Sequence, residues 1–211
     1  MRTRYNKTAD DELNGYSKYI NSKEDLQLII NDNKSINLEI GMGKGEYISK
    51  MAHLNPDKIY IGVEICKSVL ALAAKKISRY EIQNDITLNN IYIMAFDAIK
   101  INEFFNQNQI DTIYLNFSDP WPKFKHEKRR LTHELFLKEY VKVLKKDANI
   151  RIKTDNINLF QYTIVSMNNF GFKFEEVYLD LHKTEVENVL TEYESKFCEK
   201  GPIYMLVCKI K

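Results

Sequence analysis

The stretch LEIGMGKGEYI, residues 38–48, carries an apolar run into an acidic residue and then places three glycines at alternate positions before an apparent helix. A strand that passes through a glycine-rich turn directly into a helix is a common opening of ligand-binding α/β folds. Lacking Cβ atoms, Gly41, Gly43 and Gly45 let the backbone turn sharply and approach a ligand closely. A tight strand-to-helix turn without a ligand accounts for the same spacing, so this stretch alone leaves both interpretations open.

Short apolar runs alternate with longer segments of helical period on either side of this loop. The strand candidates are rich in Ile, Tyr, Val and Leu and cover residues 36–40, 59–65, 91–96, 112–117 and 149–154. Nearly continuous apolar runs are typical of strands covered on both faces, and therefore of a parallel sheet. The helix candidates are residues 24–32, 68–80 and 131–146. Right-handed crossovers would stack such helices on both faces of the sheet.

The last quarter of the chain has a different pattern. Residues 172–182 and 203–211 are both strand-like, and only a short polar segment separates them. Too little chain remains for a helical crossover, which predicts an antiparallel pair at the sheet edge. The expected fold is therefore α/β, with a mostly parallel sheet and one antiparallel edge.

The composition is that of an ordinary globular protein. Of 211 residues, 44% are hydrophobic and 28% are charged, which excludes collagen-like, disordered and disulfide-scaffold classes and suits one domain covering residues 1–211. The 31 basic and 29 acidic residues nearly cancel, so only local clusters can indicate nucleic acid. Three widely separated cysteines, Cys66, Cys198 and Cys208, predict reduced core thiols of a cytosolic protein.

No signal or membrane segment is visible in the sequence. The chain begins with a polar stretch, residues 1–20, which we expect to be a tail and for which disorder is the simplest interpretation. No apolar run approaches the roughly 18–20 residues needed to cross a bilayer. The four histidines lack ligand spacing, so we expect no metal and no membrane partner, and a cytoplasmic location.

Acidic residues stand at the ends of the first three strand candidates, the edge at which open α/β sheets bind ligands. Glu64 lies where a carboxylate commonly accepts both hydroxyls of a ribose. Glu39 brings negative charge to the glycine loop, which disfavours a pyrophosphate and favours a cationic cofactor. Asp97 can accept from an adenine amino group, although a helix N-cap explains it equally well. S-adenosylmethionine, with a ribose, a sulfonium and no phosphate, fits these acids.

The stretch NFSDPWPKFKHEKRRL, residues 116–131, follows the fourth strand candidate and therefore lies at the same edge. Pro120 and Pro122 fix φ near −65° and restrain Asp119 and Trp121, the residues before them, in extended or turn geometry. A restrained carboxylate can accept from the N–H edge of a base, and a restrained aromatic ring can stack on it. The alternative is a rigid turn with the tryptophan buried in the core.

A basic run follows these prolines. It contains a single Glu127, the aromatic Phe124, and the cations Lys123, Lys125, Lys128, Arg129 and Arg130. Runs of charge are usually solvated faces, but this run lies beside an expected ligand loop, which favours a phosphate-binding rim. The acid and aromatic residues would hold a base, and the rim would hold the nucleic acid to which the base belongs.

Six motifs, in this order over nearly the whole chain, closely resemble those of the bacterial tRNA (guanine-N7)-methyltransferases: LEIGMGKGEY, GVEI, AFDA, FSDPWPKFKHEKRRL, KTDN and TEYESKF. SDPWPK and TEYE are far more specific than the glycine loop. The resemblance implies a Rossmann-like class I methyltransferase fold with a seven-stranded sheet. It also implies S-adenosylmethionine as donor, S-adenosylhomocysteine as product, and a guanosine in the tRNA variable loop as acceptor, with the enzyme a monomer or a homodimer.

The resemblance also assigns roles position by position. Asp119 becomes a catalytic and cofactor acid, the other cofactor acids are Glu39, Glu64 and Asp97, and the substrate would be contacted by Lys123, Asp155, Thr191, Glu192, Tyr193 and Glu194. Spacing alone allows structural roles, because Thr191 and Glu194 fit a capping box and Asp155 could cap the next helix. The tail carries only Arg2, Arg4 and Lys7 where many family members have a basic tryptophan-containing motif, so we expect no RNA binding from it.

Guanine N7 has an in-plane lone pair and no proton, so its methylation needs no general base, and Asp119 is expected to orient the base. Three rival functions remain open. An amino-group methyltransferase has an acid or amide followed by two prolines and an aromatic, whereas here Trp121 separates the prolines. A nicotinamide-dependent oxidoreductase is compatible with Glu64, but Glu46 breaks its G-x-G-x-x-G pattern. A non-catalytic RNA-binding module would use the same basic run.

Overall fold

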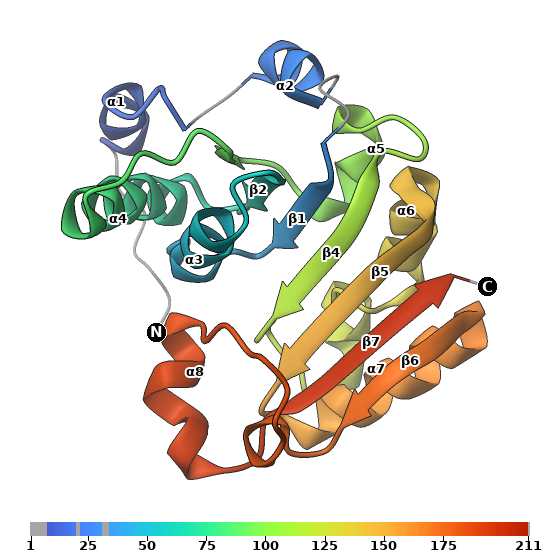
Figure 1. The fold of residues 1–211 in the computed structure, drawn as a ribbon. Coiled ribbons are helices and arrows are strands. Elements are labelled where there is room, and N and C mark those ends of the chain that lie inside the picture. Colours follow the sequence, from blue (N-terminus) through green and yellow to red (C-terminus); the bar gives the residue numbers. More distant parts are fainter. Residues whose placement is uncertain (1–7, 20–21, 31–33, 211) are drawn as a thin grey trace. The chain divides into compact units, whose positions relative to one another are not determined.

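The computed structural model describes residues 8–19, 22–30 and 34–210 (Figure 1). Within these ranges the strands form a seven-stranded mixed sheet, mostly parallel, with helices around it. The α/β architecture predicted from the sequence is thereby confirmed. The chain divides into two compact units, Met1–Ala98 and Ile99–Lys211, each with its own strands and helices.

The first unit contains three adjacent parallel strands in the order β3-β2-β1. Their bounds are β1 Ile36–Ile40, β2 Ile59–Val63 and β3 Ile91–Met94. Every residue of β1 and β2 is buried, as expected for strands covered on both faces. The second and third strands end two residues earlier than predicted, so that Glu64 and Asp97 lie in the loops that follow them.

The helices of this unit are α1 Ala9–Asn14, α2 Lys23–Ile30, α3 Glu46–Leu54 and α4 Lys67–Asn84, followed by a 3₁₀ turn, η1 Ala98–Lys100. α2 and α4 confirm the predicted helices, although residues 31 and 32 of the first lie outside the described ranges. α4 buries small residues, including Ala71, Ala73 and Ala74, which allows close packing of the helix.

Residues 8–19 of the expected polar tail contact α4. Ala9 and Leu13 are buried, and the Lys67 ammonium lies 2.8 Å from the Asp10 carboxylate. The Tyr19 hydroxyl donates to Glu81, and burial together with that carboxylate raises the pKa of Tyr19 above its usual value. Residues 1–7 and 20, which include the three N-terminal cations, lie outside the described ranges.

The second unit has four strands in the order β4-β5-β7-β6 (Figure 1). Their bounds are β4 Ile110–Asn116, β5 Leu144–Thr154, β6 Phe172–Tyr178 and β7 Tyr204–Ile210. β4 and β5 are parallel, whereas β7 is antiparallel to both β5 and β6. The predicted antiparallel pair is confirmed, with β6 outermost and β7 between β5 and β6.

The helices of this unit are α5 Ile101–Phe104, α6 Glu134–Val143, α7 Ile157–Phe170 and α8 Glu192–Phe197, with 3₁₀ turns η2 Phe124–Arg129, η3 Leu181–Lys183 and η4 Cys198–Lys200. The prediction of helix over residues 131–146 was wrong at its end. Leu144 adopts extended geometry, is buried, and pairs with Ile110, so the chain passes from α6 directly into β5. The apolar period could not distinguish a buried helix end from a buried strand start.

The long connection between β6 and β7 is anchored by its own apolar cluster. Leu181 and Ile203, at either end of the connection, are buried against Met205 and Val207 of β7, with Phe117 packed beside them. This packing fixes the segment that carries the TEYE motif over the ends of β5 and β7.

Candidate active site

In the first unit, the three predicted cofactor acids lie at one edge of the sheet. Glu39 is the last residue but one of β1, Glu64 directly follows β2, and Asp97 follows β3, so the carboxyl ends of adjacent parallel strands bring them together. Glu39 is only 3% exposed, Glu64 is half-buried and Asp97 is exposed. The Cys66 amide donates to a Glu64 carboxylate oxygen at 3.2 Å, which orients that side chain.

The glycine loop is required by backbone conformation at all three positions. Gly41, Gly43 and Gly45 have φ values of 72°, 55° and 74°, in the left-handed region where a Cβ is disfavoured. A Cβ added to Gly43 would meet nothing within 4 Å, whereas one on Gly45 would lie 3.5 Å from Ala73 and Ile77 of α4. Conformation alone therefore explains Gly43, and close helix packing contributes at Gly45.

The amides of the loop show which ligand it suits. The Gly41 and Met42 amides both donate to the Val63 carbonyl, at 2.8 and 3.1 Å, and the Gly45 amide donates to the Met42 carbonyl at 3.1 Å. A phosphate-binding loop would point such N–H groups at its ligand. Three amides used internally, beside three carboxylates, fit a cofactor that has hydroxyls and positive charge and lacks phosphate.

Gly62 was not predicted from the sequence to matter. A Cβ at this position in β2 would lie 2.1 Å from the Met42 sulfur, so the glycine makes room for the loop to fold over the strand. A glycine inside an otherwise apolar strand was the available signal, because it often marks close approach of another segment.

In the second unit, Asp119 lies on a strained loop after β4. Phe117 and Trp121, both non-glycine residues, have φ values of 49° and 42°. The Phe117 amide donates to the Lys153 carbonyl at 2.8 Å, which fixes the start of the loop on β5. Trp121 is thus in a left-handed turn rather than extended, and the Asp119 side chain is exposed.

Trp121 is half-buried and lies outside the apolar core. The Arg129 guanidinium lies over its ring, 4.9 Å from the centroid, and His126 meets the ring edge-on at 5.7 Å. The alternative of a core tryptophan is therefore wrong, and a cation of this same chain lies over the ring that was expected to stack on a base.

The basic run consists of two kinds of side chain. Lys123, Lys125, Lys128 and Arg129 are exposed, as is Phe124 at 85%. Arg130 is half-buried and donates to the Pro120 and Trp121 carbonyls, both at 3.1 Å. One common role was expected for these cations, but the fold turns Arg130 back onto the preceding loop.

Asp155 and Tyr193 meet although they are far apart in the sequence. The Tyr193 hydroxyl donates to an Asp155 oxygen at 2.8 Å, and the tyrosine ring packs against Phe117 at 5.0 Å and Phe197 at 4.4 Å. Partial burial and the neighbouring carboxylate raise the pKa of Tyr193. The helix cap considered for Asp155 comes instead from Asn156, whose side chain accepts from the Leu159 amide at 2.9 Å.

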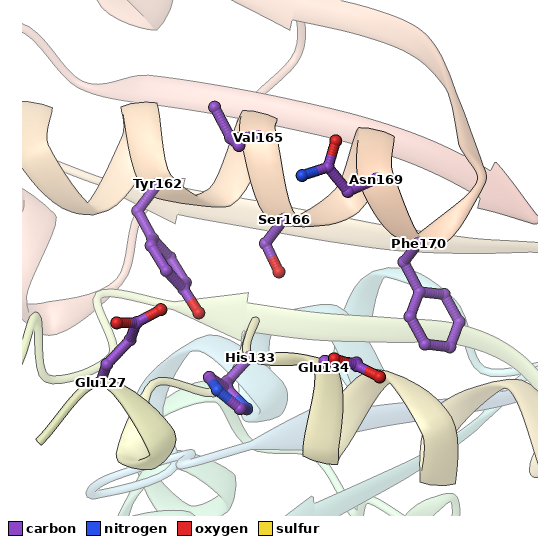
Figure 2. Close-up of a pocket in the computed structure, with 8 residues that line it drawn as sticks. All are labelled: Glu127, His133, Glu134, Tyr162, Val165, Ser166, Asn169 and Phe170. Carbon is purple, nitrogen blue, oxygen red and sulfur yellow. The ribbon is translucent and has the colours of Figure 1, made fainter.

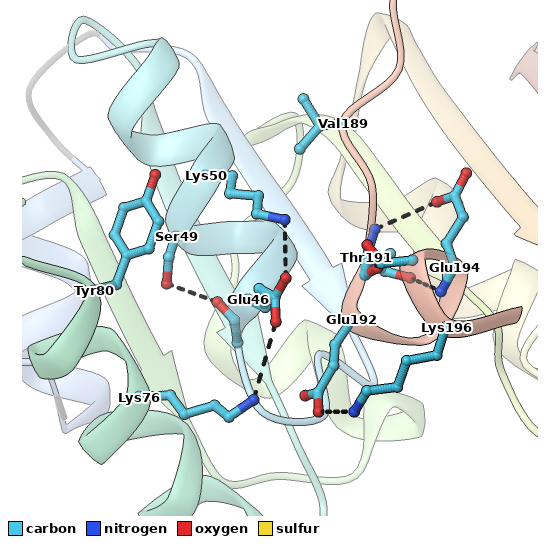
Figure 3. A network of polar contacts seen from close by, with 12 residues as sticks. Glu46, Ser49, Lys50, Lys76, Tyr80, Val189, Thr191, Glu192, Glu194 and Lys196 are labelled. Carbon is cyan, nitrogen blue, oxygen red and sulfur yellow. Dashed lines mark hydrogen bonds and ion pairs between the residues drawn. The ribbon is translucent and has the colours of Figure 1, made fainter. Parts of the chain in front are cut away.

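Thr191 and Glu194 form a capping box at the start of α8 (Figure 3). The Glu194 amide donates to the Thr191 hydroxyl at 2.9 Å, and the Thr191 amide donates to a Glu194 oxygen at 3.4 Å. Glu192, half-buried, pairs with Lys196 at 2.6 Å on the outer side of the same helix. Of the four TEYE residues, only Glu192 and Tyr193 retain exposed side-chain surface of any extent.

Glu194 is also the centre of a buried polar cluster that was not predicted from the sequence. Its oxygens accept from Lys153 at 2.7 Å and Asn188 at 2.6 Å, and one lies 2.8 Å from His182. Burial alone would raise the pKa of Glu194, but the adjacent Lys153 charge and these hydrogen bonds hold it below its usual value. The only sequence signal was a lysine at a core position of a strand.

A surface cavity of about 510 Å³ lies between α7 and the η2–α6 segment (Figure 2). Glu127, His133 and Glu134 line one side, and Tyr162, Ser166 and Asn169 line the other. None of the predicted cofactor or substrate residues borders it. Across the described ranges, no group of three or more His, Cys, Asp or Glu residues could hold a metal, and no helix could cross a membrane.

The cysteines whose side chains are described carry free thiols. Cys208 is fully buried, which raises its pKa to about 12, and Cys66 is half-buried at the N-terminus of α4. The core position predicted for Cys208 is confirmed, while Cys66 lies at the core boundary.

Solved methyltransferases share this fold. A structure entitled "Structure of an Antibiotic Related Methyltransferase" has a TM-score of 0.67 and 19% identity, covering 90% of this chain and 95% of that one. The 16S rRNA methyltransferase KamB has a TM-score of 0.67 and 13% identity, covering 90% and 94%. Residues 33–206 match the protein family described as "Putative methyltransferase". The protein is a class I S-adenosylmethionine-dependent methyltransferase, with S-adenosylmethionine as methyl donor.

Sequence relatives define the family further. The tRNA (guanine-N(7)-)-methyltransferase of Streptococcus sanguinis strain SK36 is 42% identical over 209 residues, 96% of either chain. The relative of the same name from Levilactobacillus brevis is 46% identical over 177 residues, 83% of this chain and 80% of the relative. This chain belongs to the bacterial tRNA (guanine-N7-)-methyltransferase family, as its motifs indicated.

Proposed function

We propose that this protein transfers the methyl group of S-adenosylmethionine to N7 of a guanosine in the variable loop of tRNA, forming 7-methylguanosine in the cytoplasm. The observation that carries the proposal is 42% identity, over 96% of both chains, to a tRNA (guanine-N(7)-)-methyltransferase. When bound, the donor supplies an electrophilic methyl group on a sulfonium.

The donor is held by the first unit. Glu64 accepts hydrogen bonds from the ribose hydroxyls, and Asp97 accepts from the adenine amino group. Glu39, buried at the end of β1, offers its negative charge to the cationic methionine portion. The left-handed glycines keep the loop backbone low beside the donor, and its internally bonded amides suit a ligand without phosphate.

Asp119 acts on the base rather than on a proton. Guanine presents N–H donors along one edge, and an exposed carboxylate on a fixed loop can accept from them. N7 carries a lone pair and no proton, so no general base is required. The barrier is lowered by alignment of N7, methyl carbon and sulfur, an effect worth up to about 7–11 kcal/mol for well-oriented groups.

The remaining substrate contacts come from exposed groups of the second unit. Lys123, Asp155 and Tyr193 lie on the loops after β4 and β5 and on α8, where they can contact the nucleotide. Lys125, Lys128 and Arg129 form the exposed part of the basic run and suit the phosphates of tRNA. Thr191 and Glu194 contribute through the shape of α8, because their polar atoms bond within the unit.

The test is incubation of the purified protein with methyl-labelled S-adenosylmethionine and unmodified tRNA transcripts, followed by nucleoside analysis. We expect label in 7-methylguanosine, and none from a matched transcript whose variable-loop guanosine is replaced by adenosine. Label in a different nucleoside would refute the proposed acceptor. Unchanged labelling of the substituted transcript would refute its position in tRNA.

A further inference from the structure

Arg130 makes its contacts with its own chain. Its Nε and Nη2 atoms donate to the carbonyls of two consecutive residues, Pro120 and Trp121, both at 3.1 Å. Its guanidinium lies over Tyr162 of α7, 4.2 Å from the ring centroid. A planar guanidinium that donates to two carbonyls and stacks on an aromatic ring is fixed in position and orientation.

The loop that Arg130 holds needs such an anchor. Phe117 and Trp121 both have left-handed backbone conformations that non-glycine residues adopt only where the surroundings enforce them. At the start of the loop, the Phe117 amide is fixed by its hydrogen bond to the Lys153 carbonyl of β5. At the other end, Arg130 holds the two carbonyls that follow Asp119. The Asp119 carboxylate therefore lies between two anchored points.

Tyr162, beneath the guanidinium, is itself fixed. Its hydroxyl is hydrogen-bonded to Glu127, and Figure 2 shows the two side chains directed toward one another across the mouth of the cavity. Partial burial, followed by the charge and hydrogen bond of Glu127, raises the pKa of Tyr162, so the ring stays neutral near pH 7. A continuous set of contacts thus runs from α7 through Tyr162 and Arg130 to the Asp119 loop.

We propose that Arg130 is a positioning residue that holds the Asp119 loop in its active shape and does not bind tRNA phosphate. The proposal rests on the proposed function, because it assigns to Asp119 the orientation of the acceptor base. Its neighbours Lys128 and Arg129 are exposed and suit phosphates, whereas two donors of Arg130 are used by the loop. Lysine cannot replace it, since one ammonium lacks the fork that serves both carbonyls and the plane that stacks on Tyr162.

The test compares Arg130→Gln with Lys128→Gln, which removes the same charge from the exposed part of the run. At saturating tRNA and donor, we expect Arg130→Gln to slow the single-turnover rate by about tenfold or more, as misalignment does. Its tRNA affinity and the salt dependence of that affinity should stay unchanged. Lys128→Gln should keep the rate and reduce the log–log salt slope by about 0.7–0.9. The reverse pattern, with the slope reduced and the rate kept in Arg130→Gln, would overturn the proposal.

Arg130→Lys and chemical rescue separate positioning from general destabilisation. Arg130→Lys keeps the charge but should remain slow, whereas added guanidinium should restore part of the rate of Arg130→Ala at concentrations where sodium chloride of equal strength does not. Full activity of Arg130→Lys would overturn the requirement for the fork. If Arg130→Gln fails to fold, Tyr162→Leu removes only the supporting ring and should reduce the rate in the same direction, with tRNA affinity unchanged.

A readout that needs no activity distinguishes this proposal from the proposed function. Trp121 is the single tryptophan of the chain and lies in the loop itself, so its fluorescence reports the loop directly. We expect acrylamide to quench Trp121 more strongly in Arg130→Gln than in wild type or Lys128→Gln. Unchanged quenching in Arg130→Gln would refute the positioning role. If the quenching difference is found but the wild type methylates no tRNA, only the proposed function is refuted.

Discussion

Replacing Lys153 by methionine removes one half of the ion pair that holds the TEYE segment. The Lys153 side chain is 5% exposed and that of Glu194 is fully buried, with Nζ 2.7 Å from a carboxylate oxygen. The same ammonium donates to the Asn188 side chain at 3.1 Å and to the Val189 carbonyl at 3.0 Å. Methionine fills a similar volume, so the substitution leaves a buried carboxylate without its cation and creates no large cavity.

The expected cost follows from these contacts. Breaking a buried ion pair from one side costs about 3–5 kcal/mol, because the remaining charge stays buried. Glu194 keeps hydrogen bonds from Asn188 and the Thr191 amide and its contact with His182, which favours the lower end, about 3 kcal/mol. For a chain of this length, that loss corresponds to a fall in Tm of about 6–12 °C.

The assay is urea denaturation followed by circular dichroism. Lys196→Met is the matched control, because it breaks the Lys196–Glu192 pair, whose side chains are 60% and 23% exposed, and should cost less than about 1 kcal/mol. The double variant Lys153→Met with Glu194→Leu should recover about half of the loss by removing the unpaired buried charge. A loss in Lys153→Met no larger than in Lys196→Met would refute the reasoning.

The same pair predicts a dependence of stability on pH. Folding holds the pKa of Glu194 below its unfolded value of 4.5, so the folded state is the one that favours the ionised carboxylate. Its stabilising contribution is complete above that value and is lost as pH falls through the lowered folded pKa. Glu194→Gln should therefore show a weaker loss of stability below pH 4.5 than wild type, measured by urea midpoints; parallel curves would contradict this.

Three further outcomes are expected. Asp119→Ala should abolish methyl transfer while circular dichroism and tRNA binding stay near normal, and near-normal turnover would contradict its role. Replacing three exposed cations by alanine should lower the log–log salt slope of tRNA binding by about 0.7–0.9 for each phosphate that is no longer neutralised, the cations being Lys125, Lys128 and Arg129. An unchanged slope would remove these cations from the interface. Gly43→Ala should cost about 1–2 kcal/mol in urea denaturation because of its φ of 55°, and a neutral result would contradict the conformational explanation.

The sequence was informative wherever a local pattern determines a local structure. The run before Gly41 is a buried strand because both its faces are covered, and the three glycines are there because each has a positive φ. The acids after β2 and β3 could be assigned to one edge because parallel strands end together. These inferences need only the period of the chain and the steric limits of its residues.

The features that were not predicted depend on partners distant in sequence. Lys153 and Glu194 are 41 residues apart, and no spacing rule links a lysine in one strand to a glutamate in a later helix. Arg130 is only about ten residues from the carbonyls it holds, yet its direction depends on Tyr162, which α7 brings from farther along the chain. A run of like charges was interpreted as one surface because composition does not show which members the fold turns inward.

The TEYE motif shows how a structural and a functional interpretation can both hold. The capping box and the buried carboxylate use Thr191 and Glu194 inside the unit, which removes them from direct contact with a ligand. The same bonds set the start of α8, and α8 in turn brings the Tyr193 hydroxyl to Asp155 and its ring to Phe117, at the start of the Asp119 loop. Selection for substrate binding at Tyr193 would therefore also act on Thr191 and Glu194, because replacing either would displace the tyrosine without touching the substrate directly.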